Sequence, residues 1–394
     1  MIIIDNMNKC TGCGACAMVC SKSAIQMFPN FQGFLEPVVD TVKCVNCEKC
    51  KNICHANRNL KKHLYIDAII ACNTNDEIRS QSTSGGVFFE LAKAIIKENG
   101  IVIGAAWTSD FGVEHVVVDS IEQISKLQNA KYVQSDINTT YKIAKEALLA
   151  NKHVLFSGTP CQIGGLKCFL GEEYPGLITV ELICHGVPSP KVWKKYLEYR
   201  RGQSNTDAKE IQVNMRSKST GWSTYSVEID YADGTKYSCR CMDDPYMLSF
   251  IHNMTLRSSC LECNYKGTDR VGDITLGDCW GIWNVAPEMN DNKGASLILL
   301  NSVKGQEIWG QVSAIFRTRA VDLKEIVGEN MAIMKSAVAY AEREHILESL
   351  DQEGFTILLE ETAKIKERRE LQLKNAKKAN LFKRFVHKMK SMIK

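Results

Sequence analysis

The sequence has few of the features that mark exported or membrane-spanning proteins. Among its 394 residues no apolar run approaches the ~18 residues that a transmembrane helix needs. The first residues, Met1 to Asp5, have neither the basic start nor the long apolar stretch of a signal peptide. We therefore expect a cytoplasmic protein without a membrane-spanning helix.

Several familiar catalytic signatures are absent as well. The chain has no GxGxxG after a predicted strand, no GxxxxGK[ST] and no HExxH. A Rossmann dinucleotide site, a P-loop and a zincin-type metal site are therefore unsupported. The hydrophobic share of 45% and the charged share of 24% are typical of a folded protein. At this length we expect two or three folded units with a core that needs no disulfides.

Cysteine is the residue that the chain has in excess. There are seventeen cysteines, and eight of them precede residue 55. In a chain without an export signal, such clustering indicates metal ligands or catalytic thiols and not disulfides.

The first sixty residues carry one four-cysteine spacing, CxxCxxCxxxC, twice. The two runs are Cys10, Cys13, Cys16, Cys20 and Cys44, Cys47, Cys50, Cys54. In dicluster ferredoxins the fourth cysteine of each run ligates the other cluster. We therefore predict two 4Fe-4S clusters, held by Cys10, Cys13, Cys16, Cys54 and by Cys44, Cys47, Cys50, Cys20. Zinc is the alternative, although zinc sites usually use paired CxxC units far apart.

Residues 1–60 are accordingly predicted to form a dicluster 4Fe-4S ferredoxin-like domain. The segment 2–4 is expected to start one short strand, and 33–39 is expected to form another. Ser21 and His55 stand where this pattern often has a proline after the fourth cysteine, which affects a turn and not ligation.

From residue 65 the pattern changes to strands that alternate with longer helices. Strands are predicted near 67–72, 101–107, 113–118, 153–156 and 177–184, with helices at 87–97 and 139–150. This alternation is typical of an α/β domain. The segment 224–238, with Asp233-Gly234 at its centre, predicts a β-hairpin and adds α+β character.

Four further cysteines are candidates for a third cluster. Cys161 and Cys184 each follow a predicted strand, where α/β sheets place ligands, and Cys260 and Cys263 form a CxxC pair. A zinc site, or inert buried cysteines around an isolated CxxC, is the alternative. Cys279 is a competing ligand because it is near that pair in sequence. Cys72, Cys168 and Cys239 are expected to be structural, and no role is assigned to Cys241.

With these motifs in place, residues 1 to about 350 resemble the coenzyme F420 hydrogenase/dehydrogenase beta-subunit family. The resemblance rests on several motifs in order: 82–86 (STSGG), 131–135 (KYVQS), 158–162 (GTPCQ), 184–189 (CHGVPS), the Cys260/Cys263 pair and 273–280 (DITLGDCW). Cys279 departs from the apolar residue that often stands at its position in the family.

The resemblance implies an FAD enzyme with a 4Fe-4S cluster beside the flavin, in a reductase domain at 65–350. It implies that Cys161, Cys184, Cys260 and Cys263 hold the third cluster. It places FAD near Ser82, Ser84, Gly85, Gly86, Lys131, Tyr132 and Ser135. Glycines allow backbone N–H groups to approach a pyrophosphate, which agrees with this placement. The alternative for the Ser-Gly run is a plain loop before a helix, with Ser84 as N-cap.

Three more polar residues lie in the family motifs. His185 is a candidate catalytic proton donor, since an imidazole titrates near neutral pH. A histidine that only makes a local hydrogen bond is the alternative. Asp273 and Asp278 could contact cofactor or substrate, or cap loops.

The segment 360–394 is predicted to be a basic amphipathic tail. From residue 364 onward it has twelve Lys and Arg against two acids. One helical face would carry Leu381, Phe382, Phe385, Val386, Met389 and Ile393. Such a helix favours contact with an anionic membrane at the inner face, and a solvated or partner-binding tail is the alternative. We expect no nucleic-acid partner, because no aromatic stacking platform accompanies the charge.

These observations predict an iron–sulfur flavoprotein oxidoreductase. Electrons would pass from ferredoxin or a similar redox protein through 4Fe-4S clusters to FAD, and then to a small-molecule acceptor such as a deazaflavin. One alternative is an electron-transfer subunit of a larger hydrogenase or dehydrogenase complex. Another, suggested by the tail, is a membrane-associated reductase of a cell-envelope or polysaccharide precursor.

Overall fold

The structure, a computed structural model, describes residues 4, 6–203 and 208–392, with side chains described as far as residue 375. Ile2 and Ile3 of the predicted first strand lie outside the described residues. So do the side chains of the predicted apolar tail face, Leu381, Phe382, Phe385, Val386, Met389 and Ile393.

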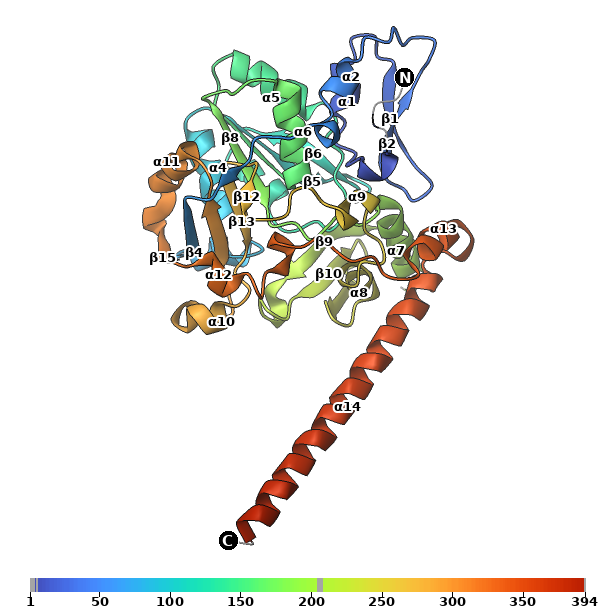
Figure 1. Ribbon diagram of the computed structural model, residues 1–394, viewed down its shortest axis with the longest axis vertical. Coiled ribbons are helices and arrows are strands. Elements are labelled where there is room, and N and C mark those ends of the chain that lie inside the picture. Colours follow the sequence, from blue (N-terminus) through green and yellow to red (C-terminus); the bar gives the residue numbers. More distant parts are fainter. Residues whose placement is uncertain (1–3, 5, 204–207, 393–394) are drawn as a thin grey trace.

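The amino-terminal unit is small and lies beside the main body (Figure 1). Its strands β1 and β2 pair antiparallel from Ile25 to Pro29 and from Leu35 to Val39. The partner of the predicted strand at 33–39 is therefore a segment that the sequence pattern missed. The helical pieces are η1 (Met7–Lys9), α1 (Ala15–Val19), α2 (Lys49–Asn52) and η2 (His55–Asn57).

The main body is built on an eight-stranded sheet in the order β15-β4-β14-β13-β8-β7-β5-β6. The strands are β4 (Asp67–Asn73), β5 (Ile101–Trp107), β6 (Val113–Val118), β7 (Val154–Gly158), β8 (Leu177–Leu182), β13 (Ile274–Asp278), β14 (Ser296–Leu300) and β15 (Phe316–Ala320). Strands β5, β7, β8 and β13 run parallel to one another at the centre. Their carboxyl ends therefore meet at one edge of the sheet.

The sheet is mixed, and helices cover both of its faces, as they do around parallel strands such as those at its centre. Alternate side chains of β5 point to opposite faces of the sheet. On one face, Val102 packs in a cluster with residues of α4 (Val87–Lys97) and α11 (Val303–Val312). Ile101 and Ile103 pack on the other side with α5 (Thr140–Leu149) and α6 (Pro160–Leu170). The result is a three-layer α/β arrangement, which confirms the predicted fold class.

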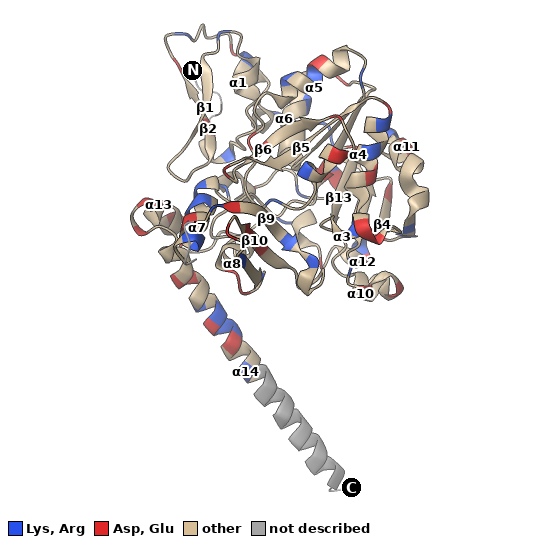
Figure 2. Ribbon diagram, turned by 180° about the vertical axis from the view of Figure 1, so that it is seen from behind, with Lys and Arg blue, Asp and Glu red and all other residues tan. Residues whose placement is uncertain are grey.

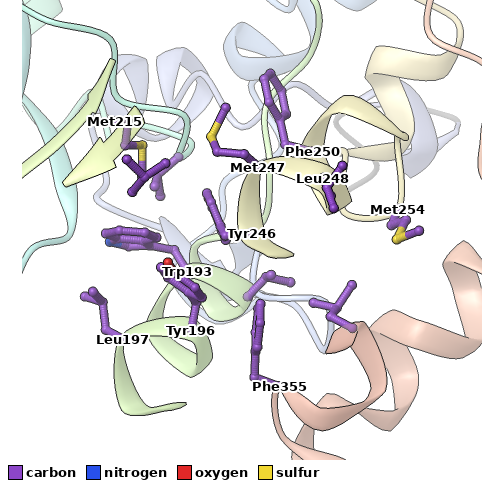
Figure 3. Packing of buried hydrophobic residues seen from close by; sticks show 14 of the residues in the cluster. Trp193, Tyr196, Leu197, Met215, Tyr246, Met247, Leu248, Phe250, Met254 and Phe355 are labelled. Atoms are coloured by element: carbon purple, nitrogen blue, oxygen red, sulfur yellow. The ribbon is translucent and has the colours of Figure 1, made fainter. Parts of the chain in front are cut away.

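A second, three-stranded antiparallel sheet adds the predicted α+β character. It consists of β9 (Glu210–Ser217), β10 (Ser226–Tyr231) and β11 (Lys236–Arg240), and the turn at Asp233-Gly234 joins the last two. Its core, shown in Figure 3, includes Trp193 and Tyr196 from α7 (Pro190–Gln203) and Tyr246 from α8 (Pro245–Ile251). The rings of Tyr196 and Phe355 lie 5.1 Å apart and join this core to the carboxy-terminal helices.

The segment 322–350, before the last helix, is only partly helical. It contains α12 (Leu323–Ile326) and η7 (Met331–Ile333) before α13 (Arg343–Glu353). The last helix, α14 (Thr356–Met392), leads away from the body (Figure 1). Lys, Arg, Asp and Glu are interspersed along its described part (Figure 2). Within the described residues, no helix is long and apolar enough to cross a membrane.

The remaining elements are short. They are β3 (His63–Leu64), α3 (Asp76–Ser80), η3 (Glu122–Leu127), η4 (Lys218–Thr220), α9 (Ser258–Leu261), β12 (Asp269–Arg270), α10 (Ile282–Val285), η5 (Pro287–Met289) and η6 (Ser313–Ile315).

Candidate functional site

Two of the predicted site cysteines lie at the carboxyl edge of the main sheet. Cys161 is in the first turn of α6, directly after β7, and Cys184 follows β8. Helix α6 begins here because Thr159 and Gln162 form a capping box and Pro160 occupies the first helical position. The Thr159 hydroxyl lies 3.1 Å from the Cys161 sulfur. The adjacent parallel strands thus bring the two thiols to neighbouring positions.

The CxxC pair reaches the same place through a short antiparallel contact. The Arg257 N–H donates to the Val187 carbonyl and the Ser189 N–H to the Thr255 carbonyl, each at 3.0 Å. The Val187 N–H lies 3.4 Å from the Cys260 sulfur. As a result one cavity is lined by all four predicted ligands of the third set, Cys161, Cys184, Cys260 and Cys263.

Burial governs the acidity of these thiols. Burial, followed by the neighbouring Cys260, raises the pKa of Cys184 to about 12. Burial and then Cys184 raise the pKa of Cys161 as well. Desolvated thiols in one cavity are poor thiolates by themselves, whereas iron provides the positive charge that stabilises thiolates. The donor set therefore fits an iron–sulfur cluster.

The two amino-terminal sets are also brought together as the spacing predicts. For Cys16, burial is the largest cause of a raised pKa, and Cys13, Cys10 and Cys54 are the neighbours that add to it. A separate cavity is lined by the second set, Cys20, Cys44, Cys47 and Cys50. In the described part of the chain, no three His, Cys, Asp or Glu side chains are placed to hold a single metal ion.

A buried arginine fixes the first run to the body. Arg257 donates to the Cys10 carbonyl at 2.7 Å, to the Leu35 carbonyl at 3.0 Å and to the Gln134 side chain at 2.9 Å. Gln134 in turn donates to the Thr11 carbonyl at 2.9 Å. The backbone around the first two cysteines of the run is thereby held by side chains of the larger domain.

Close packing brings the first run up against the third set. A Cβ on Gly165, one turn after Cys161, would lie 3.0 Å from the Cys13 sulfur. The thiol of Cys161 is among the neighbours that raise the pKa of Cys13, after burial. Glycine at 165 therefore allows the two cysteine sets to approach.

A hydrogen-bonded pair of rings lies between the same two sets. His55, which follows Cys54, is buried and lies 2.7 Å from the Tyr265 hydroxyl and 2.9 Å from the Thr11 hydroxyl. Tyr265 comes two residues after Cys263. His55, which stands where the dicluster pattern often has a proline, thus makes a contact between the two domains. Tyr265, Arg257 and Gln134 were not predicted as site residues, because nothing in their spacing marks them as interface residues.

The predicted Ser-Gly loop lies at the same carboxyl edge, after β4. The Ser84 hydroxyl donates to the Ala295 carbonyl at 2.6 Å, and the Gly85 N–H donates to the Ser296 hydroxyl at 2.9 Å. Gly86, at φ +85°, is the N-cap of α4, so Ser84 is not the cap that the plain-loop alternative requires. A Cβ on Gly85 would lie 2.2 Å from the Ala71 carbonyl oxygen, so this glycine is needed for packing.

The predicted residues of the 131–135 segment lie next to this loop. Gln128 donates to the Ser82 hydroxyl at 3.3 Å, which links the two segments. Lys131 donates to the Gln128 and Asn129 carbonyls, and burial lowers its pKa to about 7. The Ser135 hydroxyl lies 2.7 Å from His115 Nδ1 and is committed to that contact.

This region also contains a buried arginine, with unpaired donors, that was not predicted from the sequence. Arg216 is buried between the rings of Tyr225 and Trp280, at 4.0 and 5.4 Å. Its Nη1 donates to the Tyr132 hydroxyl at 3.1 Å and pairs with Asp278 at 3.0 Å. Its Nε and Nη2 have no hydrogen-bond partner among the described residues. Buried donors without a partner are costly, so an anionic ligand group would satisfy them.

A second missed cation, Lys218, completes this region. Its ammonium donates to the carbonyls of Arg79, Ser84 and Lys293, and burial lowers its pKa to about 7. We call Lys131, Arg216 and Lys218 the cationic site. Arg216 lies on β9 and Lys218 follows its end, and an Arg-x-Lys pair was the only signal that the sequence offered. Buried positive charge and unpaired donors fit the pyrophosphate of a dinucleotide such as FAD.

Aromatic rings connect the cationic site to the third cysteine set. The ring of Phe250 lies 4.7 Å from that of Tyr132 and 5.2 Å, edge-on, from that of His185. His185 follows Cys184 and lies 2.6 Å from the Asn253 side-chain oxygen, and burial lowers its pKa. Its geometry therefore matches the local hydrogen-bonding role better than that of a proton donor.

The other candidates divide between the two edges of the sheet. Asp278 pairs with Arg216 and accepts from the Trp222 indole at 3.1 Å, so it belongs to the cationic site. Asp273 accepts from Thr179 and Ser302 before β13 begins, where it ties loops together. Cys279 is fully buried beside Cys72, and it does not line the cavity of the third set.

Comparisons with known proteins agree with these observations. Residues 9–57 match the 4Fe-4S dicluster domain family, and residues 151–325 match the family described as the C terminus of the coenzyme F420 hydrogenase/dehydrogenase beta subunit. The search of curated proteins finds no match. Among solved structures, the chain is similar to a chain of the F420-reducing [NiFe] hydrogenase complex from Methanosarcina barkeri, studied by xenon derivatization. The identity is 19% and the TM-score 0.43, over 69% of this chain and 93% of that one.

The predicted family resemblance is therefore confirmed. The chain joins a 4Fe-4S dicluster domain to the C-terminal domain of the coenzyme F420 hydrogenase/dehydrogenase beta-subunit family. It is an iron–sulfur electron-transfer protein of an oxidoreductase family.

Proposed function

We propose that this member of the F420 hydrogenase/dehydrogenase beta-subunit family is an iron–sulfur flavoprotein that passes electrons between a redox protein and a small-molecule acceptor. The observation that carries the proposal is the order of the groups in space. The second set contains Cys47, the one exposed cysteine among the described residues, the first set adjoins the third, and Phe250 links the third set to the cationic site.

Twelve cysteines would hold three 4Fe-4S clusters in this arrangement. They are Cys10, Cys13, Cys16 and Cys54, then Cys20, Cys44, Cys47 and Cys50, and finally Cys161, Cys184, Cys260 and Cys263. Clusters of this kind supply one-electron transfer at low potential, and a flavin converts single electrons to two-electron chemistry.

The protein's own residues position these groups. Arg257 and Gln134 hold the first run in place by bonding its backbone carbonyls, and the hydrogen-bonded pair of His55 and Tyr265 lies between the first and third sets.

Flavin binding is proposed at the cationic site, in the form of FAD. Arg216 has two donors to offer the pyrophosphate, while Lys131 and Lys218 add positive charge that burial makes unfavourable without an anion. The Ser82–Gly86 loop, Tyr132 and Ser135 are proposed to lie around the bound flavin. The acceptor is proposed to be a deazaflavin or another reducible small molecule, in keeping with the family to which residues 151–325 belong.

The test is flavin binding by the anaerobically purified protein. Arg216→Met keeps the volume of the side chain but removes its donors and charge. We expect FAD affinity to fall by at least about tenfold, since a charge-assisted hydrogen bond contributes roughly 1.5–3 kcal/mol. The control is Arg317→Met, because Arg317 is an exposed residue that pairs with Asp291. Equal FAD affinity in the two variants would contradict the proposed flavin site. Absence of FAD binding by the unaltered protein would contradict it as well.

The second candidate function is that of an electron-transfer subunit in a larger redox complex. The similarity to a chain of a hydrogenase complex does not decide it. Reduction of an added acceptor by the isolated chain, with a viologen as electron source, would favour the enzyme. Activity that appears only with a partner chain would favour the subunit.

The cellular setting is proposed to be the cytoplasm, with the 364–394 segment in contact with an anionic membrane at the inner face. Cosedimentation of full-length protein with phosphatidylglycerol vesicles, compared with a chain that ends at residue 363, tests this. Equal sedimentation of the two chains would contradict the membrane contact and with it the idea of a reductase for cell-envelope precursors.

A further inference from the structure

The second cysteine set differs from the other two because it lies at the surface. Cys47 is exposed, Cys20 and Cys44 are partly buried and Cys50 is buried, and the cavity lined by this set is formed only by residues between 20 and 50. Residues of the larger domain line no part of that cavity. Whatever the four thiols hold is therefore within reach of another molecule, whereas the third set is covered by the amino-terminal unit.

Lysines surround this exposed set. Lys22 and Lys49 line its cavity, and Lys51 follows Cys50 by one residue. All three side chains are exposed, and none of them is in an ion pair within the described part of the chain. Lys43 is also exposed, but it pairs with Asp40 at 3.2 Å. Glu48 is the one acid between Lys43 and Lys51 in the sequence, so the surface around the thiols is positively charged.

Two exposed valines lie within the same surface. Val42 is 94% exposed and Val45 is 60% exposed, and Val45 lines the cavity of the second set. An apolar side chain stabilises the fold only when it is buried, so these exposed valines add little to the stability of the protein. We call Lys22, Val42, Val45, Cys47, Lys49 and Lys51 the distal face. Its apolar centre with a basic rim has the composition of a transient protein–protein interface.

We propose that the distal face docks an acidic one-electron carrier protein of the ferredoxin type. This inference rests on the proposed electron-transfer function and names the surface and the charge of the partner. Positive charge around the exposed thiol set would attract a negatively charged surface and orient it, since complementary charges steer association. The face does not fit a membrane, because two valines without an amphipathic helix are too small an apolar surface for insertion.

The experiment measures binding and not turnover. Full-length, iron-loaded protein is immobilised anaerobically, and an acidic two-cluster ferredoxin is used as the probe across a range of salt concentrations. We expect the dissociation constant to rise with salt, because exposed charges are screened within about 10 Å at 0.1 M ionic strength.

Two sets of variants separate charge from apolar contact. Lys22→Glu, Lys49→Glu and Lys51→Glu together are expected to weaken binding by at least about tenfold at low salt and to remove its salt dependence. The matched control combines Lys97→Glu, Lys126→Glu and Lys152→Glu, which change the net charge equally at exposed positions outside the amino-terminal unit. Val42→Ser with Val45→Ser is expected to weaken binding a few-fold at every salt concentration.

Iron content and viologen-driven activity are measured on each variant, so that failure of the docking face is distinguishable from failure of the proposed function. Loss of ferredoxin binding with iron and viologen activity intact supports the distal face. Equal effects of the two lysine triples, absence of ferredoxin binding by a fully loaded protein, or better binding to a basic cytochrome would each overturn the proposal. Binding of phosphatidylglycerol vesicles through the same lysines, in place of ferredoxin, would overturn it as well.

Discussion

The two four-cysteine runs have one spacing but different surroundings. The first run is packed against α6 and bonded by Arg257, and burial raises the pKa of Cys13 to about 12. In the second run Cys44 and Cys54 are partly buried and Cys50 is buried, but Cys47 is exposed. The spacing of a run specifies which thiols can share a cluster, whereas the packing around it determines whether the cluster faces the interior or a partner.

The largest effect on stability is expected from loss of the contact between the first run and the larger domain. Arg257→Ala leaves the Cys10 and Leu35 carbonyls and Gln134 without their charged donor. We expect a loss of roughly 3 kcal/mol in the free energy of unfolding, since removing one member of a buried charged network is costly. The measurement is the thermal midpoint of the anaerobic protein together with its iron content.

The equivalent change beside the second run serves as its control. Lys43→Ala removes an exposed pair with Asp40, so we expect little change in the free energy of unfolding. If Lys43→Ala destabilised the protein as much as Arg257→Ala, the two runs would not differ in the way that the structure indicates.

A single methyl group tests the close approach of the first and third sets. Gly165→Ala places a Cβ 2.9 Å from the Tyr141 hydroxyl and 3.0 Å from the Cys13 sulfur, so we expect a loss of about 1–3 kcal/mol from overpacking. Gly310→Ala in α11 meets no atom within 4 Å and is expected to stabilise the helix by up to about 1 kcal/mol. Denaturant unfolding followed by circular dichroism separates the two, and equal midpoints would contradict the tight packing.

Loss of the hydrogen bond between His55 and Tyr265 is expected to have an effect of similar size. Tyr265→Phe keeps the ring but removes the hydroxyl 2.7 Å from His55 Nδ1, which leaves that buried nitrogen unpaired. We expect a cost of about 1–3 kcal/mol in stability. Tyr174→Phe is the control, since Tyr174 makes an exposed hydrogen bond to Glu172. Thermal midpoints that fall equally in the two variants would argue against a special role for the His55 contact.

The smallest expected effect is the pH dependence of flavin binding. Burial lowers the pKa of Lys131 and of Lys218 to about 7, and an anionic flavin favours their charged forms. FAD affinity should therefore be highest below about pH 7 and fall by roughly two- to tenfold by about pH 8.5, as the lysines lose their protons. Fluorescence titration checks this, and Lys131→Met with Lys218→Met should remove the dependence. An affinity that rises with pH would contradict the assignment.

Much of this organisation could be predicted from local sequence patterns. The dicluster domain follows from cysteine spacing, and the position of Cys161 and Cys184 follows from the rule that parallel strands end at one edge. The strand at 25–29 was missed because Gln26 and Pro29 interrupt its apolar pattern.

The residues that join the parts could not be predicted in the same way. Arg257, Gln134 and Tyr265 act through contacts with residues far away in the chain, and such contacts leave no periodic signal. Arg216 was missed for a related reason, since its role depends on rings from two other segments and on donors that remain unpaired. Cys279 shows the converse, because closeness in sequence to the CxxC pair did not bring it to the same cavity.

The most direct test of the central claim is iron, sulfide and flavin quantitation on one anaerobically purified sample. Three four-thiolate sets and a flavin site predict about twelve irons and one FAD per chain. In Cys184→Ser, which alters only the third set, the iron content should fall to about eight. About eight irons without flavin in the unaltered protein would contradict the account, and the larger domain would then not be the redox centre proposed for it.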